Sequence, residues 1–360
     1  MWRLYNRKDL LMNKKKLGLA NVVSISVGLV VATSCLVSLG EGSGTLGVTF
    51  ILAMAIAMLL NMTTVASLSE LNALMPNTTG GLAQYTLAAI GPLPTLVSMV
   101  GGYIICNTMS CGVEASIFSF SLADTIGGNI PSIVYTFIMT FIILLANLRG
   151  VDMFAKIQDI VAFLLVGSLV VMGFIGMIGA GMGAKVDQPF VLEADFKGIA
   201  SMTAVAFWLF IGAEYAIPIS KEVKNAKRNV PLGMMIGLFL IFIMQSVMVL
   251  GFHNYVEWGK LADSAAPHLL YGYAILGKFG KIWMMLVGAL AVINSLAVIC
   301  QGMAKMNMMP KIFAKTNKYK VPWFGQVFVS AAIFLFAFVS NNSADMIDFL
   351  ILAGSVIWMV

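Results

Sequence analysis

Long apolar stretches separated by short polar segments dominate the sequence. Most are close to the 20 residues that a helix needs to cross a bilayer. Their apolar residues run continuously instead of alternating with polar ones, which favours membrane helices over the strands of a barrel. We predict nine complete spans and most of a tenth, at 19–40, 46–73, 95–122, 131–147, 157–181, 199–219, 231–252, 281–301, 325–340 and 345–360.

The composition supports an all-α polytopic membrane protein. Of the 360 residues, 60% are hydrophobic and 11% are charged, whereas about 25% are charged in ordinary soluble domains. So few charged side chains do not cover a soluble protein of this size. An ordinary cytosolic enzyme, a disordered chain and a nucleic-acid-binding domain are therefore excluded. The four cysteines lie in apolar stretches without metal-ligand spacing, so we interpret them as packing residues and expect no metal site.

The basic residues predict the orientation of the chain. With a cytoplasmic N-terminus, the inner segments are 1–18, 74–94, 148–156, 220–230 and 302–324, and they hold 17 of the 22 Lys and Arg residues. Cytoplasmic loops carry an excess of Lys and Arg. We therefore expect a multi-pass plasma-membrane protein with its N-terminus in the cytoplasm.

The last apolar stretch, 345–360, stops without a polar or basic cap. A helix that ends in hydrocarbon leaves its last carbonyl groups unsatisfied. We therefore expect the sequence to be a C-terminally truncated version of a longer protein.

Two spans contain features that interrupt a membrane helix. Small and hydroxyl residues gather in the middle of the first span, from Ser24 to Ser34, and the sixth span contains Gly212, Glu214 and Pro218. Interrupted helices in corresponding positions of two halves are the best sequence indication of a secondary-transporter site. The alternative is that the small residues only allow close helix packing.

Two carboxylates lie deepest in the spans. Glu114 is in the third span and Glu214 in the sixth. An acid at the middle of a membrane costs on the order of 3 kcal/mol by insertion scales, so both are candidates for ion or proton coupling. The alternative is a neutral, hydrogen-bonded Glu that joins helices.

Sequence signatures of enzymes and of ATP-driven pumps are missing. There is no HExxH, no Gly-rich nucleotide loop followed by Lys and Ser or Thr, and no Gly-x-Ser-x-Gly. We therefore predict that the protein is not an enzyme, uses no cofactor and does not bind nucleic acid.

Several motifs in order make the chain similar to a known family. The motifs are Ser69-Glu70-Leu71 followed by Pro76, Gly80-Gly81, Tyr85 and Gly91-Pro92; Asn147-Leu148-Arg149-Gly150-Val151; Phe210-Ile211-Gly212-Ala213-Glu214 with 221–231 after it; and Met309-Pro310 with Val321-Pro322. Together they resemble the amino acid permeases of the amino acid–polyamine–organocation (APC) superfamily, over about residues 18–360. Ala226 stands where that family usually has proline.

The resemblance implies an inverted five-plus-five helix repeat with broken first and sixth helices, followed by two further helices. In this chain we expect a basic cytoplasmic N-terminus at 1–18, a first five-helix repeat at 19–198 and a second at 199–360. The second repeat would be incomplete at its tenth helix, so that about 10 of 12 spans are present.

The resemblance also implies a substrate site. In the first helix the aligned residues are Ala32, Thr33 and Ser34. The family usually has glycines there, and their loss predicts a less sharp break because glycine reaches unusual φ/ψ values at low cost. The other implied positions are Trp208, Ile211 and Gly212 in the sixth span and Asn107 and Ser110 in the third.

The function implied is secondary active transport of amino acids by alternating access. The expected partners are an amino acid or small amine, a coupled proton, cation or exchanged substrate, and the lipid bilayer. The alternatives are an organic amine or polyamine permease or exchanger, or an inactive or sensing protein that resembles a permease.

Overall fold

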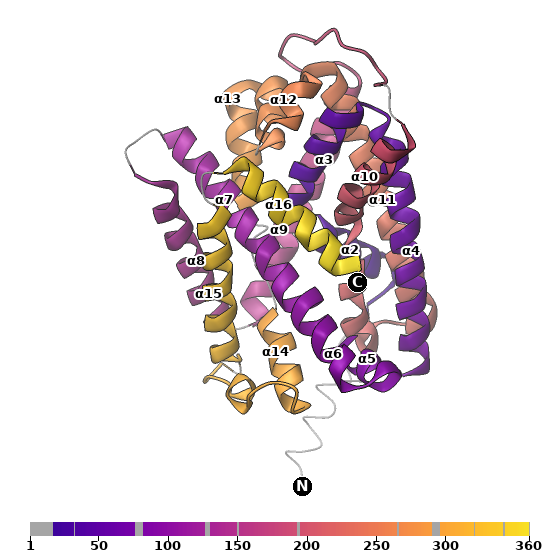
Figure 1. Ribbon diagram of the computed structural model, residues 1–360, viewed down its shortest axis with the longest axis vertical. Helices are drawn as coiled ribbons and strands as arrows, with labels where there is room; N and C mark the ends of the chain where they lie inside the picture. Colours follow the sequence, from indigo (N-terminus) through magenta and orange to yellow (C-terminus); the bar gives the residue numbers. More distant parts are fainter. Residues whose placement is uncertain are drawn as a thin grey trace.

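Helices account for nearly all the secondary structure in the computed structural model (Figure 1). The structure describes residues 17–31, 33–75, 82–126, 130–149, 151–192, 195–264, 266–289, 296–319, 321–340 and 343–359. Within these residues the extended pairing consists of two isolated bridges, Leu17 with Val223 and Gly47 with Val191. The prediction of an all-helical protein is confirmed for this part of the chain.

The first half of the chain runs up and down the long axis of the molecule (Figure 1). Its elements include one π-helix, η1, near the start of the third predicted span. In order they are α2 (Leu19–Val30), α3 (Thr33–Leu46), α4 (Phe50–Leu74), α5 (Leu82–Ile90), α6 (Pro92–Val97), η1 (Ser98–Ile105), α7 (Cys106–Ile126), α8 (Ser132–Leu148) and α9 (Val151–Met177).

In the second half, the described residues contain three 3₁₀ segments and a helix with a sharp kink. The kink divides α13 at Leu276 and Gly277, whose backbone angles are not helical. The elements are α10 (Phe196–Phe207), η2 (Trp208–Phe210), η3 (Ala213–Glu222), α11 (Ala226–Tyr255), α12 (Trp258–Ala262), α13 (Pro267–Ala289), α14 (Leu296–Lys305), η5 (Lys311–Ala314), α15 (Trp323–Ser340) and α16 (Ala344–Met359).

Four helices in the described residues are long and apolar enough to cross a membrane, judged by length and composition. They are Phe50–Leu74, Pro92–Ala123, Ala226–Tyr255 and Trp323–Ser340, which correspond to the predicted spans at 46–73, 95–122, 231–252 and 325–340. The fifth predicted span lies largely within the 27-residue helix α9, and the remaining ones contain shorter or divided helices. The predicted eighth span, 281–301, passes through 290–295, which lie outside the described residues.

The fifth predicted span ends at residue 181, a few residues past the end of the helix that forms it. Its helix, α9, ends at Met177. Gly179 follows with a positive φ of 70°, a conformation that glycine adopts without strain. The chain then crosses one end of the molecule as a long connection to α10, which begins after Asp195, whose Oδ1 accepts from the backbone N–H of Gly198 at 2.7 Å.

Small residues allow the long helix α11 to contact its neighbours closely. A Cβ added to Gly237 would lie 2.9 Å from Cβ of Ser26 in α2, and one added to Gly173 in α9 would lie 3.1 Å from Sδ of Met248 in α11. Glycines of this kind let membrane helices approach backbone to backbone. The result is a buried centre made by α2, α4, α9 and α11.

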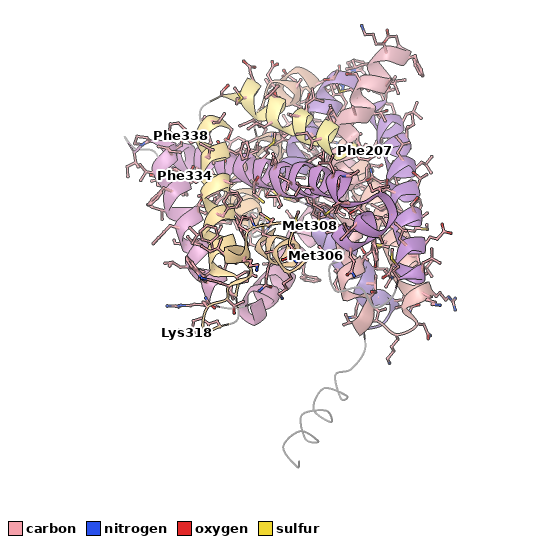
Figure 2. All side chains as sticks on the ribbon, turned by 60° about the horizontal axis from the view of Figure 1, so that its bottom comes forward. Phe207, Met306, Met308, Lys318, Phe334 and Phe338 are labelled. Atoms are coloured by element: carbon pink, nitrogen blue, oxygen red, sulfur yellow. The ribbon has the colours of Figure 1, made fainter. Side chains whose placement is uncertain are left out.

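Large apolar side chains cover the outer faces of several helices. Phe137 and Phe141 of α8 are each about half exposed and stack along that helix, and Phe338 of α15 is 60% exposed. Figure 2 shows Phe334 and Phe338 on the same side of the molecule, with Lys318 at the margin of the end that faces the viewer. Such faces suit contact with lipid.

Candidate functional site

The first span is interrupted between α2 and α3. α2 ends at Val30, Val31 has extended backbone angles (φ −78°, ψ 109°), and α3 begins at Thr33. Any L-residue adopts such angles, so Val31 itself does not need to be a glycine. Ala32 lies outside the described residues, and Thr33 and Ser34 are the first two residues of α3.

The sixth span is interrupted more strongly. α10 ends at Phe207, η2 continues for a single 3₁₀ turn, and Ile211 is extended (φ −72°, ψ 136°). Gly212 follows with φ 122° and ψ −15°, a region that residues with a Cβ avoid. The backbone at Ile211 and Gly212 is therefore not helical, as the mid-span glycine predicts.

Three carbonyl groups at this break accept hydrogen bonds from side chains of other helices. The amide of Asn61 in α4 donates to the carbonyl of Phe207 at 3.3 Å, and the amide of Gln245 in α11 donates to that of Leu209 at 3.3 Å. The thiol of Cys35 in α3 lies 3.9 Å from the carbonyl oxygen of Trp208. A break frees carbonyl groups from the helix, and here three surrounding helices supply their partners.

Asn61, Gln245 and Cys35 were not among the residues predicted from the sequence. Two of them carry a detectable signal, because an Asn or Gln in the middle of an apolar span is costly unless it has a partner. Asn61 is 4% exposed and Gln245 is 2% exposed. What the sequence does not reveal is the partner, since Asn61 and Phe207 lie 146 residues apart.

Glu214 lies directly after the break and is 5% exposed. Its Oε2 accepts a hydrogen bond from the backbone N–H of Gly212 at 3.0 Å, while its Oε1 is buried with no hydrogen-bond partner. An unsatisfied acceptor in a membrane interior is unfavourable. The geometry therefore suits a carboxyl group that gains a proton or a positively charged partner.

Trp208 links the break to two further helices. Its side chain is 7% exposed. A Cβ added to Gly354 in α16 would lie 3.2 Å from Cζ3 of the indole ring, and the thiol of Cys106 in α7 donates to the carbonyl of Gly354 at 3.2 Å. One face of the ring is therefore packed against α16, next to the start of α7.

The three candidates on α7 occupy one face of that helix, at spacings of three and four residues. The Asn107 amide donates to the carbonyl of Tyr103 at 2.7 Å, within the same stretch of helix. The hydroxyl of Ser110 donates to Oε1 of Glu114 at 3.4 Å, and Glu114 is 3% exposed. Ser110 and Glu114 therefore lie together, whereas α7 reaches the break through Cys106 and Gly354.

A metal centre receives no support in the described part of the chain. There, no group of three or more His, Cys, Asp or Glu side chains is arranged to hold a metal ion. The site consists of two interrupted helices, the side chains that bind their free backbone groups, and a buried carboxyl group.

The family model for amino acid permeases matches residues 21–359, which include both interruptions. The chain belongs to the amino acid permease family. It is therefore a multi-pass membrane protein of the transporter kind, and its family consists of permeases and not of enzymes. The resemblance carried by the sequence motifs is confirmed.

Individual relatives include transporters of different substrates. The chain is 30% identical over 163 residues to the L-methionine/branched-chain amino acid exporter YjeH of Escherichia coli, an alignment that covers 44% of this chain and 37% of that protein. It is 22% identical over 347 residues to the branched-chain amino acid permease BcaP of Bacillus subtilis, covering 86% of this chain and 71% of that permease.

An exchanger is also similar. The arginine/ornithine antiporter of Latilactobacillus sakei is 25% identical over 349 residues, covering 87% of this chain and 72% of the antiporter. Membership of the family thus establishes that the chain is a permease, whereas these relatives differ in the substrates that they carry.

Proposed function

We propose that this permease moves amino acids across the membrane by alternating access. The observation that carries the proposal is the pair of interrupted helices, α2–α3 and α10–η3, in the first and sixth predicted spans. A paired break provides free N–H groups at one half-helix end and free carbonyl groups at another. These ends suit the carboxylate and the ammonium group that all free amino acids carry.

In this proposal the substrate carboxylate binds at the N-terminus of α3, beside Thr33 and Ser34. A helix N-terminus offers unpaired N–H groups and a partial positive charge. Ala32 precedes it, at the break. Asn107 and Ser110 of α7 select the substrate side chain.

The substrate ammonium binds at the carbonyl of Trp208. The neighbouring carbonyls of Phe207 and Leu209 already accept from amide groups, whereas the thiol 3.9 Å from the Trp208 oxygen is a weak donor. The backbone N–H of Ile211 also donates to the Trp208 oxygen, at 3.4 Å. A carbonyl oxygen has two lone pairs, so in this proposal the ammonium takes the place of the weak thiol donor. The ring of Trp208 closes over the substrate, and the non-helical Ile211 and Gly212 leave room for the backbone to approach.

Coupling is assigned to the buried carboxyl groups. Oε1 of Glu214 is buried without a partner, so a proton gained there removes a buried charge and turns this oxygen into a hydrogen-bond donor. Glu114, bonded to Ser110, is the second candidate. Glu214→Gln keeps an acceptor for the N–H of Gly212 but no longer exchanges a proton, and we expect uptake to lose its dependence on a pH gradient.

The architecture proposed is an inverted repeat of 19–198 and 199–360 after a basic N-terminal segment, 1–18, with the N-terminus in the cytoplasm of a plasma membrane. A test uses two exposed lysines that lie on opposite sides of this arrangement. In intact cells, a cysteine at position 197 should react with a membrane-impermeant thiol reagent, and one at position 224 should not. The reverse pattern would invert the topology.

Uptake by proteoliposomes tests the function. Purified protein is supplied with labelled methionine, leucine, arginine or putrescine, with and without internal substrate and a pH gradient. Saturable amino acid uptake supports the proposal. Uptake of putrescine alone favours an organic amine permease, stimulation by internal substrate favours an exchanger, and binding without uptake favours a sensor.

A further inference from the structure

The kink in α13 folds its two halves into a tight helical hairpin. Leu276 (φ −130°, ψ 19°) and Gly277 (φ 61°, ψ −148°) form the bend. Beside it the backbones of Gly272 and Gly280 touch, because a Cβ added to Gly272 would lie 2.7 Å from the carbonyl oxygen of Gly280. Since glycines meet at the crossing, the two backbones can approach this closely.

A cavity of about 570 Å³ lies in this hairpin and opens to the surface of the protein. Leu269, Leu270 and Tyr273 of the first half line it, with Lys278, Lys281 and Ile282 of the second half and the turn that precedes α13. The cavity therefore combines two cationic side chains with apolar walls. It lies at the end of the molecule that carries α12 and α13, at the top in Figure 1.

The surroundings of the cavity match the boundary between lipid and water. In the half of α13 that follows the bend, Phe279, Ile282 and Leu286 are 67%, 40% and 51% exposed. Such exposure is expected of a face that contacts acyl chains. Lys278 and Lys281 lie in the first turn of this second half of α13, where long cationic side chains reach the head-group region.

The charged side chains among the described lining residues of the cavity are both basic. They are Lys278 and Lys281. Asp263 directly precedes a lining residue along the chain, but it is exposed and does not itself line the cavity. Glu257 pairs with Lys260 at 2.9 Å. Two lysines beside an apolar wall favour a ligand with an anionic head and a hydrocarbon tail.

We propose that this cavity binds an anionic phospholipid of the leaflet at the α12–α13 end. The phosphodiester lies between Lys278 and Lys281, near the hydroxyl of Tyr273, and an acyl chain follows Ile282 and Leu286. The site requires a membrane but not the substrate site, so it stands independently of the proposed function.

The test compares the effects of lipids on purified protein in detergent. Phosphatidylglycerol and phosphatidylcholine with the same acyl chains are titrated against wild type and against the double variant Lys278→Gln, Lys281→Gln. The readouts are the melting temperature and the number of lipids retained in native mass spectrometry. Each lysine near a membrane surface contributes on the order of a fivefold preference for anionic lipid, so the double variant should bind phosphatidylglycerol about 30-fold more weakly.

Matched variants keep the result specific. Lys197→Gln removes an exposed lysine at the same end of the molecule, outside the cavity, and should behave as wild type. Lys278→Arg, Lys281→Arg keeps both charges and should retain most of the affinity. Without added lipid, all variants should melt close to wild type.

Three outcomes would overturn the proposal. One is equal stabilisation of wild type by the two lipids. Another is an unchanged preference for phosphatidylglycerol in the double Gln variant, and the third is full replacement of the lipid by inorganic phosphate, which would make the cavity a site for a soluble anion.

Discussion

The hydroxyl of Tyr85 donates a hydrogen bond to Oδ1 of Asn72 at 2.9 Å. The same oxygen accepts from the hydroxyl of Ser220 at 3.2 Å. Asn72 therefore joins the end of α4 to α5 and to the end of η3. All three side chains are buried: Asn72 is 5% exposed, Tyr85 2% and Ser220 8%.

Removing the shared acceptor, Asn72, should lower the stability of the protein more than removing one of its donors. Asn72→Leu leaves two buried hydroxyls without a partner, at about 1–3 kcal/mol each, whereas Tyr85→Phe removes one bond worth about 1 kcal/mol. We expect a clearly lower melting temperature for Asn72→Leu than for Tyr85→Phe in detergent. The opposite order would mean that the tyrosine hydroxyl has another important partner.

The amide groups of Asn61 and Gln245 should be required for transport. Asn61→Leu and Gln245→Leu each leave a carbonyl of the interrupted helix unpaired, so we expect at least a tenfold loss of uptake and a stability loss of about 1–3 kcal/mol. Ser246→Ala is the control for Gln245, because the hydroxyl of Ser246 bonds to Phe242 in its own helix. Normal uptake by both Leu variants would show that the break keeps its conformation without these two amide groups.

The backbone angle of Gly212 makes substitution costly even for alanine. At φ 122° a residue with a Cβ is strained by about 1–3 kcal/mol, so Gly212→Ala should lower the melting temperature. Gly302→Ala in α14 is the control, since a Cβ there meets nothing within 4 Å. Lost transport in a Gly212 variant therefore identifies a binding residue only when the surviving folded fraction is measured too.

Trp208 can be tested as a wall of the site against its alternative, an ordinary packed side chain. For a purely packed side chain, Trp208→Ala should cost about 3–5 kcal/mol of stability and leave substrate affinity unchanged. For a wall that contacts an ammonium substrate, affinity should fall by the equivalent of about 0.5–2 kcal/mol. Calorimetric binding and melting temperature on the same preparation separate the two.

Gly354 offers a second approach to the same question. Gly354→Val adds bulk next to the indole ring, where even a Cβ would lie 3.2 Å from Cζ3. We expect Gly354→Val to weaken substrate binding as Trp208→Ala does, because the ring must shift. An affinity equal to wild type would exclude the packed face of the ring from any role in binding.

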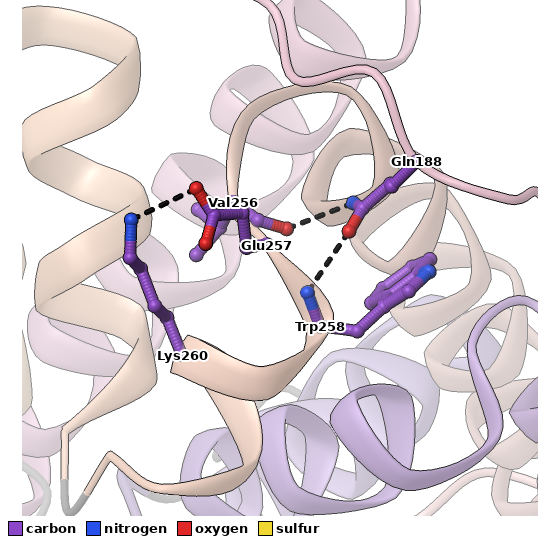
Figure 3. A network of polar contacts seen from close by, with 5 residues as sticks. All are labelled: Gln188, Val256, Glu257, Trp258 and Lys260. Carbon is purple, nitrogen blue, oxygen red and sulfur yellow. Dashed lines mark hydrogen bonds and ion pairs between the residues drawn. The ribbon is translucent and has the colours of Figure 1, made fainter.

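Gln188 should hold the connection between α9 and α10 in place. Its Nε2 donates to the carbonyl of His253 at 2.8 Å. The same Nε2 donates to the carbonyl of Val256 at 2.9 Å, and Oε1 accepts from the N–H of Trp258 at 2.9 Å (Figure 3). Gln188→Ala should lower the free energy of unfolding by about 1–3 kcal/mol, measured in detergent.

A charge change at this position gives the sharper test. Gln188→Glu should cost more than Gln188→Ala, because it sets a carboxylate oxygen against two carbonyls. The neighbouring exposed residue provides a control, Asp187→Asn, which should stay within about 0.5 kcal/mol of wild type. A Glu variant as stable as wild type would contradict the network.

The breaks were predictable from sequence because their causes are local. Gly212 stands alone in an apolar span, and small residues gather ahead of Thr33. The partners that hold the breaks were not predictable, since Asn61 meets Phe207 and Ser220 meets Asn72 across 146 and 148 residues. The kink in α13 was missed for a different reason: its two halves are both apolar and helical, and one glycine among several makes the bend.

The π-helix η1 bears on how the third span tolerates changes in length. The backbone N–H of Cys106 donates to the carbonyl of Gly101, five residues back. A π-helical segment holds an extra residue compared with an α-helix of the same rise. Deleting one residue within 98–105 therefore returns the chain to α-helical bonding without rotating α7. The same deletion between Asn107 and Glu114 rotates the residues after it by about 100° relative to those before it. Asn107, Ser110 and Glu114 therefore keep their common face when the length varies within η1 and lose it when the length varies between them.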